Sequence, residues 1–178
     1  MEREPADFVR RLAAARIGDT FNQYAPSNVL RRRLCIYLES RRGARLLLVG
    51  EAAGYRGARV SGLPFTSERQ LTGSGPAEAT ATIMHRVLAE LGLEHSVLLW
   101  NVVPTHPHRP GEPDSNRRPT RAEVEAAIPF LEALASRRRV VAVGRLAAAT
   151  LGAPYVRHPS HGGAREFRTR LVELLVGG

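Results

Sequence analysis

The sequence contains no lysine and a single cysteine, Cys35. A Walker phosphate-binding loop is therefore excluded, because it requires a lysine. One cysteine also excludes an intramolecular disulfide and any zinc or iron–sulfur site built from several thiolates. The chain lacks an apolar run long enough to span a membrane, and its start lacks a signal-peptide core. These absences predict a cytoplasmic protein that does not enter a membrane.

Positive charge is in excess, and arginine supplies all of it. The 26 basic residues outnumber the 17 acidic residues and give a net charge of +9. Such an excess attracts polyanions, including nucleic acids. A solvated basic surface explains the same balance nearly as well, so charge alone does not identify a partner.

The length of 178 residues predicts one domain, residues 1–178, with a sizeable core. Short apolar runs alternate with helical stretches, which predicts an α/β fold whose parallel sheet is covered on both faces. The expected strands are 46–49, 96–100, 140–143 and 155–158. The expected helices are 7–15, 28–38, 76–91, 120–134, 144–151 and 164–176. A capping box of Thr120 and Glu123 marks the start of the fourth helix.

Three loops follow three of the expected strands, at residues 50–68, 101–118 and 158–163. Loops at the carboxyl ends of parallel strands lie at one edge of the sheet, where open α/β sheets bind ligands. The second loop is rich in proline and arginine, and loops of this length are usually functional or disordered. A strand followed by a glycine turn is common, so the prediction depends on the three loops together.

Four side chains on these loops suit recognition of a flat heterocycle. Phe65 offers a stacking face, and the Asn101 amide can donate and accept hydrogen bonds in one plane. His158 can stabilise an oxygen on which charge develops, and Glu51 can hold a water molecule or stabilise a cationic sugar. Three of them have a structural alternative: a turn cap for Asn101, a core position for Phe65 and a structural role for His158.

Two histidine pairs have spacings that can suggest a metal site, His106-x-His108 and His158-x-x-His161. Neither pair lies in a helical context or has a carboxylate partner, which metal sites of this type require. We therefore predict no metal and no other cofactor.

The same loops resemble the motifs of the uracil-DNA glycosylase superfamily. The matching residues are Gly50-Glu51-Ala52-Ala53-Gly54, Gly62-Leu63-Pro64-Phe65, Asn101-Val102-Val103 and His158-Pro159-Ser160. They are nearest to the patterns of its family-four branch, G-E-[AG]-P-G, G-[RK]-P-F, N-V-V and H-P-[SA], in the same order. The resemblance implies hydrolysis of the N-glycosidic bond of deoxyuridine in DNA, which leaves an abasic site. It also implies a three-layer α/β/α fold with a central four-stranded parallel sheet.

The resemblance further implies roles for individual residues. Phe65 would stack on the flipped uracil, Asn101 would read its edge and His158 would face its O2, so the implied catalytic residues are His158, Glu51 and Asn101. Gly50 and Ala52 would line the pocket. The implied DNA contacts are Ser67, Arg109, Arg117, Arg118, Ser160, His161, Gly162 and Arg165. The expected partner is uracil-containing DNA, bound by a monomer.

The chain departs from the family at several positions. The cluster cysteines of family four are absent, and Ala53 replaces a proline. Ala52 stands where the best-known branch has a water-activating aspartate, and Gly54 or Gly57 stands where relatives have a bulky residue that blocks thymine. The chain therefore resembles a cluster-free, divergent member, and its missing bulk predicts tolerance of uracil substituted at C5. Gly162 occupies the position of a leucine wedge in relatives, which predicts a preference for single-stranded DNA.

Two other functions fit the sequence. A protein with this fold can hold uracil or single-stranded DNA without excising the base, and Ala52 favours that reading. An unrelated α/β hydrolase acting on a small nucleoside is the second alternative. Salt-sensitive DNA binding argues against the nucleoside hydrolase.

Overall fold

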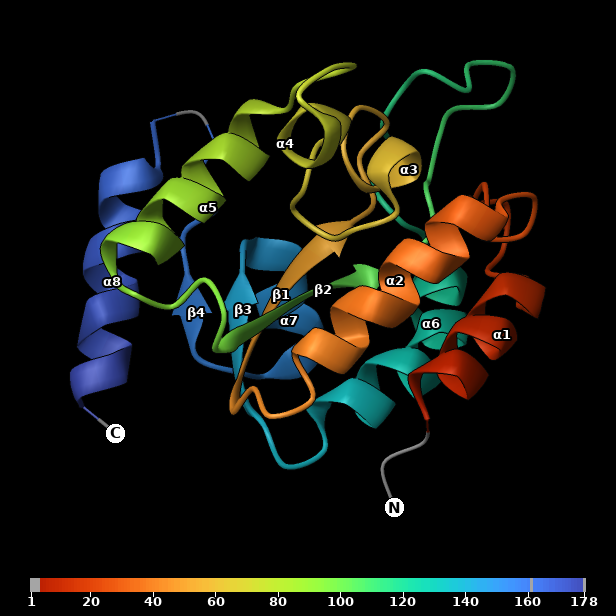
Figure 1. Ribbon diagram of the computed structural model, residues 1–178. Coiled ribbons are helices and arrows are strands. Elements are labelled where there is room, and N and C mark those ends of the chain that lie inside the picture. The colour runs from red at the N-terminus through yellow and green to blue at the C-terminus, as the bar shows by residue number, and fades with distance from the viewer. Residues whose placement is uncertain (1–3, 161, 178) are drawn as a thin grey trace.

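A four-stranded, all-parallel sheet forms the centre of the computed structural model, which describes residues 4–160 and 162–177 (Figure 1). The spatial order of the strands is β2-β1-β3-β4. The strands are Leu46–Ala52 (β1), Val97–Val103 (β2), Arg139–Val143 (β3) and Tyr155–Val156 (β4). The predicted α/β class and the four parallel strands are confirmed.

Helices connect the strands and cover both faces of the sheet. They are Pro5–Ala14 (α1), Asn28–Ser40 (α2), Ala58–Ser61 (α3), Glu68–Thr72 (α4), Ala79–Glu90 (α5), Arg121–Ala135 (α6), Arg145–Leu151 (α7) and Ala164–Val176 (α8). Among the described residues, no helix combines the length and apolar character needed to cross a bilayer.

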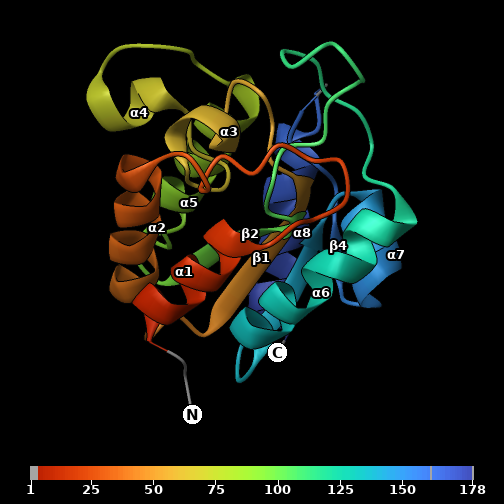
Figure 2. The same ribbon diagram turned by 90° about the vertical axis from the view of Figure 1, so that its right-hand side faces the viewer.

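The two faces of the sheet build two separate apolar cores, because successive side chains of a strand point to opposite sides. Leu47 and Val49 of β1 pack in one core with residues of α1, α2, α6 and α7. Leu46 and Leu48 pack in the other core with residues of α5 and α8. Figures 1 and 2 show α5 and α8 on one side of the sheet and α1, α6 and α7 on the other. This arrangement confirms the three-layer α/β/α architecture.

Strands β1 and β2 are longer than the apolar runs predicted. Pairing continues past the expected ends, with Gly50 opposite Asn101 and Ala52 opposite Val103. Asn101 therefore lies within β2, not after it. A strand position holds its side chain more rigidly than a loop position does, because backbone pairing orients it.

Strand β4 is shorter than expected, since it ends at Val156 and not at residue 158. Its last partner is Val143, after which Gly144 turns the chain into α7. With no further partner on β3, the chain leaves the sheet before His158. The shortening places that histidine on a loop above the sheet edge.

The sequence predicted that helix α5 begins at Pro76, but in the structure it begins at Ala79. Glu78 precedes the helix with an extended backbone, at φ −125° and ψ 122°. The loop after β1 also contains the two short helices α3 and α4, which no apolar periodicity indicated. Figure 1 shows these helices and the loop between β2 and α6 at the same end of the sheet.

Candidate active site

A small pocket of about 60 Å³ opens at the carboxyl ends of β1 and β2. Its lining residues are Glu51, Ala52, Gly54, Ala58, Phe65, Glu78, Thr80, Asn101 and His158. They come from each of the three predicted loops and from the start of α5. The structure thus brings together five predicted site residues, Glu51, Ala52, Phe65, Asn101 and His158.

Gly50, a sixth predicted residue, forms the floor on which two of these side chains rest. A Cβ atom at Gly50 would lie 2.3 Å from Cζ of Phe65 and 2.9 Å from Oδ1 of Asn101. Real Cβ atoms do not approach other atoms so closely, so only glycine fits. The absence of a side chain at this position is what lets the ring and the amide meet.

Phe65 has a backbone that residues other than glycine rarely adopt, with φ at 51°. Neighbouring hydrogen bonds hold this conformation. The Ser61 hydroxyl donates to the carbonyl of Thr66 at 2.6 Å, and the Tyr24 hydroxyl donates to the carbonyl of Gly62 at 2.9 Å. Strained backbone persists where the surroundings over-determine it, commonly at functional sites. The ring of Phe65 therefore lies at the pocket with little freedom to move.

The Asn101 side chain has no hydrogen-bond partner among the described residues, and its amide is open to the pocket. The residue is only 4% exposed. A polar side chain that lines a pocket and makes no bond to the protein is free to pair with a ligand. A ligand that donates to the amide oxygen and accepts from the amide N–H would satisfy both groups.

His158 is oriented by Ser160, two residues further along the loop. The Ser160 backbone N–H donates to Nδ1 of His158 at 3.3 Å, and the Ser160 hydroxyl lies 2.7 Å from the same nitrogen. Because Nδ1 accepts, the neutral ring has its proton on Nε2. Ser160 thus positions His158, and its phosphate contact stays a prediction. A Cβ atom at Gly163 would lie 2.2 Å from the His158 carbonyl, so the loop requires glycine there.

Glu51 is half-buried at the pocket and makes no hydrogen bond to another described residue. Burial raises the pKa of its carboxyl, and the positive charge of Arg118 opposes this shift. Arg118 belongs to the second loop, so the interaction brings that loop to the rim of the pocket. Together the two residues give the rim one negative and one positive group.

Glu78 is a pocket residue that the sequence analysis missed. It lies next to α5, half-buried, and burial raises the pKa of its carboxyl. No signal in the sequence indicated it, because a helix beginning at Pro76 would include Glu78, and only the structure places Glu78 at the N-cap, where serine, threonine, aspartate or asparagine are preferred. A glutamate there gains no cap hydrogen bond, which points to another role.

The long second loop is held against the first by hydrogen bonds. His106 is fully buried, and its Nδ1 lies 2.8 Å from the carbonyl of Ala53. The backbone N–H of Tyr55 donates to the side chain of Asn116 at 3.0 Å. Nε2 of His106 lies 3.2 Å from the carbonyl of Pro113, so both ring nitrogens contact the backbone and the residue has a structural role. Burial lowers the pKa of His106, and the two carbonyls oppose this shift. The loop is thus an ordered wall of the site.

Two predicted DNA contacts have partners inside the protein instead. The Arg117 guanidinium forms a double ion pair with buried Glu123, at 2.5 and 2.8 Å. Ser67 is fully buried at the start of α4, where its hydroxyl donates to Gln70 at 2.9 Å. Neither side chain is presented to a DNA phosphate, so these two assignments are corrected.

The other predicted DNA contacts are exposed. Arg109, Arg118, Gly162 and Arg165 all lie on the surface. Arg109 pairs with Glu112 at 3.2 Å, which is a weak surface interaction that a phosphate can replace. His161 lies outside the described residues.

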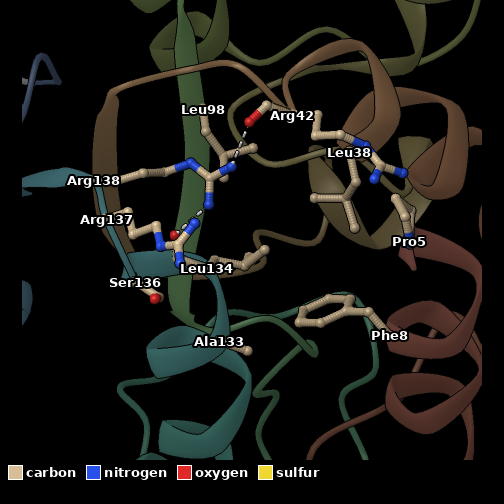
Figure 3. A pocket seen from close by; sticks show the side chains of 10 residues that line it. All are labelled: Pro5, Phe8, Leu38, Arg42, Leu98, Ala133, Leu134, Ser136, Arg137 and Arg138. Carbon is tan, nitrogen blue, oxygen red and sulfur yellow. Dashed lines mark hydrogen bonds between the residues drawn. The ribbon is translucent and has the colours of Figure 1, made fainter. Parts of the chain in front are cut away.

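A larger cavity, of about 280 Å³, lies at the opposite end of the sheet, near the amino ends of the strands (Figure 3). Two of its three arginines, Arg42 and Arg138, have partners within the protein. Arg138 donates to the carbonyls of Leu134 and Ala44 at 2.7 and 2.9 Å, and Arg42 pairs with Glu39 at 2.6 Å. Its apolar floor includes Phe8 and Leu38. It contains none of the predicted site residues.

The family model of the uracil DNA glycosylase superfamily matches residues 38–174, and the chain belongs to this superfamily. The match includes all three loops and every residue of the pocket. No curated protein sequence matches the chain. Membership supports a DNA glycosylase in general.

The fold is similar to the crystal structure of wild-type SMUG2 from Pedobacter heparinus, with a TM-score of 0.72. The similarity covers 97% of each chain, at 11% sequence identity. At this identity the comparison establishes the shared fold, while the chemistry depends on the residues of the pocket.

Proposed function

We propose that the protein is a monofunctional uracil-DNA glycosylase, which hydrolyses the N-glycosidic bond of deoxyuridine in DNA and releases uracil. The observation that carries the proposal is the amide of Asn101, which lines the pocket beside the ring of Phe65 and has no hydrogen-bond partner among the described residues. A flat base with a donor and an acceptor on one edge satisfies both groups at once. Uracil, with N3–H and O4 adjacent, has that edge.

The target nucleotide leaves the DNA stack and enters the pocket, at a cost of about a few kcal/mol. Phe65 stacks on the base, while the Asn101 amide accepts from N3–H and donates to O4. Cytosine presents the reverse pattern at these two positions. A fixed amide therefore rejects it by about 1–3 kcal/mol.

The bond between C1′ and N1 then breaks, and its electron pair leaves with the base. Negative charge builds on uracil O2, where the Nε2–H of His158 donates a hydrogen bond that strengthens as charge develops. Such oxyanion contacts contribute about 3–4 kcal/mol to lowering a barrier. Glu51 orients the water molecule that adds to C1′ and offsets the positive charge on the sugar.

The exposed arginines at the rim bind the DNA backbone. Arg118 lies closest to the chemistry, since its charge acts on Glu51. Arg109, on the same loop as Arg118, and Arg165, in the first turn of α8, extend the basic surface. The net charge of +9 attracts DNA to the protein as a whole.

The test is incubation with a labelled oligonucleotide containing one deoxyuridine, followed by alkali and a denaturing gel. Strand cleavage that requires alkali identifies an abasic product and therefore excision. An Asn101→Ala variant and an oligonucleotide with thymidine in place of deoxyuridine are the controls. DNA binding without an alkali-labile site would instead identify a non-catalytic binding protein, which Ala52 favours.

A further inference from the structure

Glu78 occupies the space that the first loop leaves empty. A Cβ atom at Gly57 would lie 1.8 Å from Oε2 of Glu78, and one at Gly54 would lie 3.3 Å from Oε1. The carboxyl group thus lies where a side chain from either glycine would project. Gly54 and Glu78 both line the pocket. The missing bulk at the two glycines is therefore supplied from the start of α5.

Structural stabilisation does not explain this placement. The carboxyl of Glu78 makes no hydrogen bond or ion pair with any other described residue. Its backbone carbonyl accepts from the N–H of Thr82 at 3.1 Å, but any residue can supply that bond. Burial without a partner disfavours a charged carboxyl, which is why its pKa is raised. Burying a carboxyl group without a partner costs free energy, so its position inside the pocket indicates that it contacts the ligand.

The other edges of a bound base already have partners. In the proposed binding mode, Asn101 pairs with N3–H and O4, and His158 pairs with O2. N1 is bonded to the sugar, so C5 and C6 form the one edge that remains. Glu78 makes no hydrogen bond with Asn101 or His158. The side of the pocket formed by Gly54, Gly57 and Glu78 can therefore contact the C5–C6 edge of the base.

We propose that Glu78 closes the pocket opposite C5 of the base and restricts the substrate to uracil without a C5 substituent. This inference rests on the proposed function. A methyl or hydroxymethyl group at C5 collides with the carboxyl oxygens, and an apolar methyl also removes water from them without offering a hydrogen bond. Discrimination by one such group in a pocket is typically about 10–200-fold. The tolerance predicted from the two glycines alone is thereby reversed.

The experiment compares wild type, Glu78→Ala and Glu78→Gln on single-stranded oligonucleotides containing uracil, thymine or 5-hydroxymethyluracil. Because glutamine keeps the size of glutamate, we expect Glu78→Gln to exclude the substituted bases as wild type does. Glu78→Ala should raise the kcat/KM ratio of substituted base to uracil by about 10-fold or more. Thermal melting of each variant establishes that it is folded.

A binding measurement separates this proposal from the proposed function. Free uracil should raise the melting temperature of wild type and thymine should not, whereas both should raise that of Glu78→Ala. Selective binding without excision would overturn the proposed function and support the role of Glu78. Excision of 5-hydroxymethyluracil by wild type as fast as uracil would overturn the role of Glu78 alone. An unchanged ratio in Glu78→Ala would overturn it as well.

Discussion

The ring of Phe65 occupies the space in which residue 50 would carry a side chain. The distance from an ideal Cβ at Gly50 to Cζ of Phe65 is only 2.3 Å. Gly50 lies in β1 and Phe65 in the segment that follows it, and the strained backbone of Phe65 brings them together. This contact sets the position of the stacking face relative to Asn101, and the first prediction follows from it.

Gly50→Ala should lower excision of uracil by about 100-fold, because displacing a substrate-positioning group by about 1 Å has an effect of that size. The methyl group displaces both the ring of Phe65 and Oδ1 of Asn101. Gly43→Ala is the matched control, since a Cβ there meets nothing within 4 Å. Single-turnover rates of the two variants make the comparison. Equal rates would show that Phe65 does not stack on the base.

Asn101→Asp should lose uracil activity by about 10-fold or more, or gain activity on cytosine, because a carboxylate accepts hydrogen bonds but cannot donate to O4. The change also places a charge at a position only 4% exposed, with no described partner. Rates on otherwise identical oligonucleotides with uracil or cytosine test it. An unchanged preference for uracil would mean that another group reads the base.

His158→Ala should slow excision by about 100-fold or more while leaving DNA affinity nearly unchanged, since its hydrogen bond grows as charge develops. Ser160→Ala should have a smaller effect, about 5-fold, which corresponds to one neutral hydrogen bond. Its hydroxyl orients His158 through the 2.7 Å contact. Single-turnover rates and equilibrium DNA binding separate the two steps. A wild-type rate for His158→Ala would remove this residue from the mechanism.

Arg117→Ala should lower the free energy of unfolding by about 2–3 kcal/mol at neutral pH, because it leaves buried Glu123 without its ion pair. Burial alone would raise the pKa of Glu123, but hydrogen bonds from Arg117 and the backbone of Thr120 outweigh it and lower the pKa. The stabilisation is therefore present above the unfolded pKa and is lost as pH falls through the lower folded value.

Denaturant unfolding of Arg117→Ala and Arg118→Ala at neutral and acidic pH measures this effect. Exposed Arg118 is the matched control, with an expected change within about 0.5 kcal/mol. The difference between the two variants should shrink in acid. If Arg117→Ala is as stable as Arg118→Ala at neutral pH, the ion pair does not hold the second loop.

Excision should be faster from single-stranded DNA than from a U·A pair. Gly162 is exposed, with φ at 76°, and has no side chain to fill the gap left by a flipped base. The energy of unpairing, about a few kcal/mol, is then not offset at this loop. Initial rates on matched single- and double-stranded oligonucleotides decide the point. Faster excision from U·A would indicate that a residue of another loop, the segment 109–118, fills the gap left by the flipped base.

Local patterns in the sequence determined the sheet and the main site residues. Strands β1, β2 and β3 each contain an apolar run, which the sequence shows because burial on both faces of the sheet requires it. Phe65, Asn101 and His158 were identifiable because they follow those runs, and parallel strands bring their carboxyl ends to one edge. The exact strand ends were not identifiable, since pairing such as that of Gly50 with Asn101 depends on a partner strand.

Only the tertiary structure decided what fills the site and which arginines remain available. Gly54 and Gly57 indicate missing bulk in the sequence, yet Glu78 supplies it from the start of another element. Arg117 and Arg118 are adjacent and chemically identical, but one is paired with buried Glu123 and the other is exposed. The physical reason is that steric filling and ion pairing depend on distances between side chains. Folding sets these distances, and the order of residues along the chain does not reveal them.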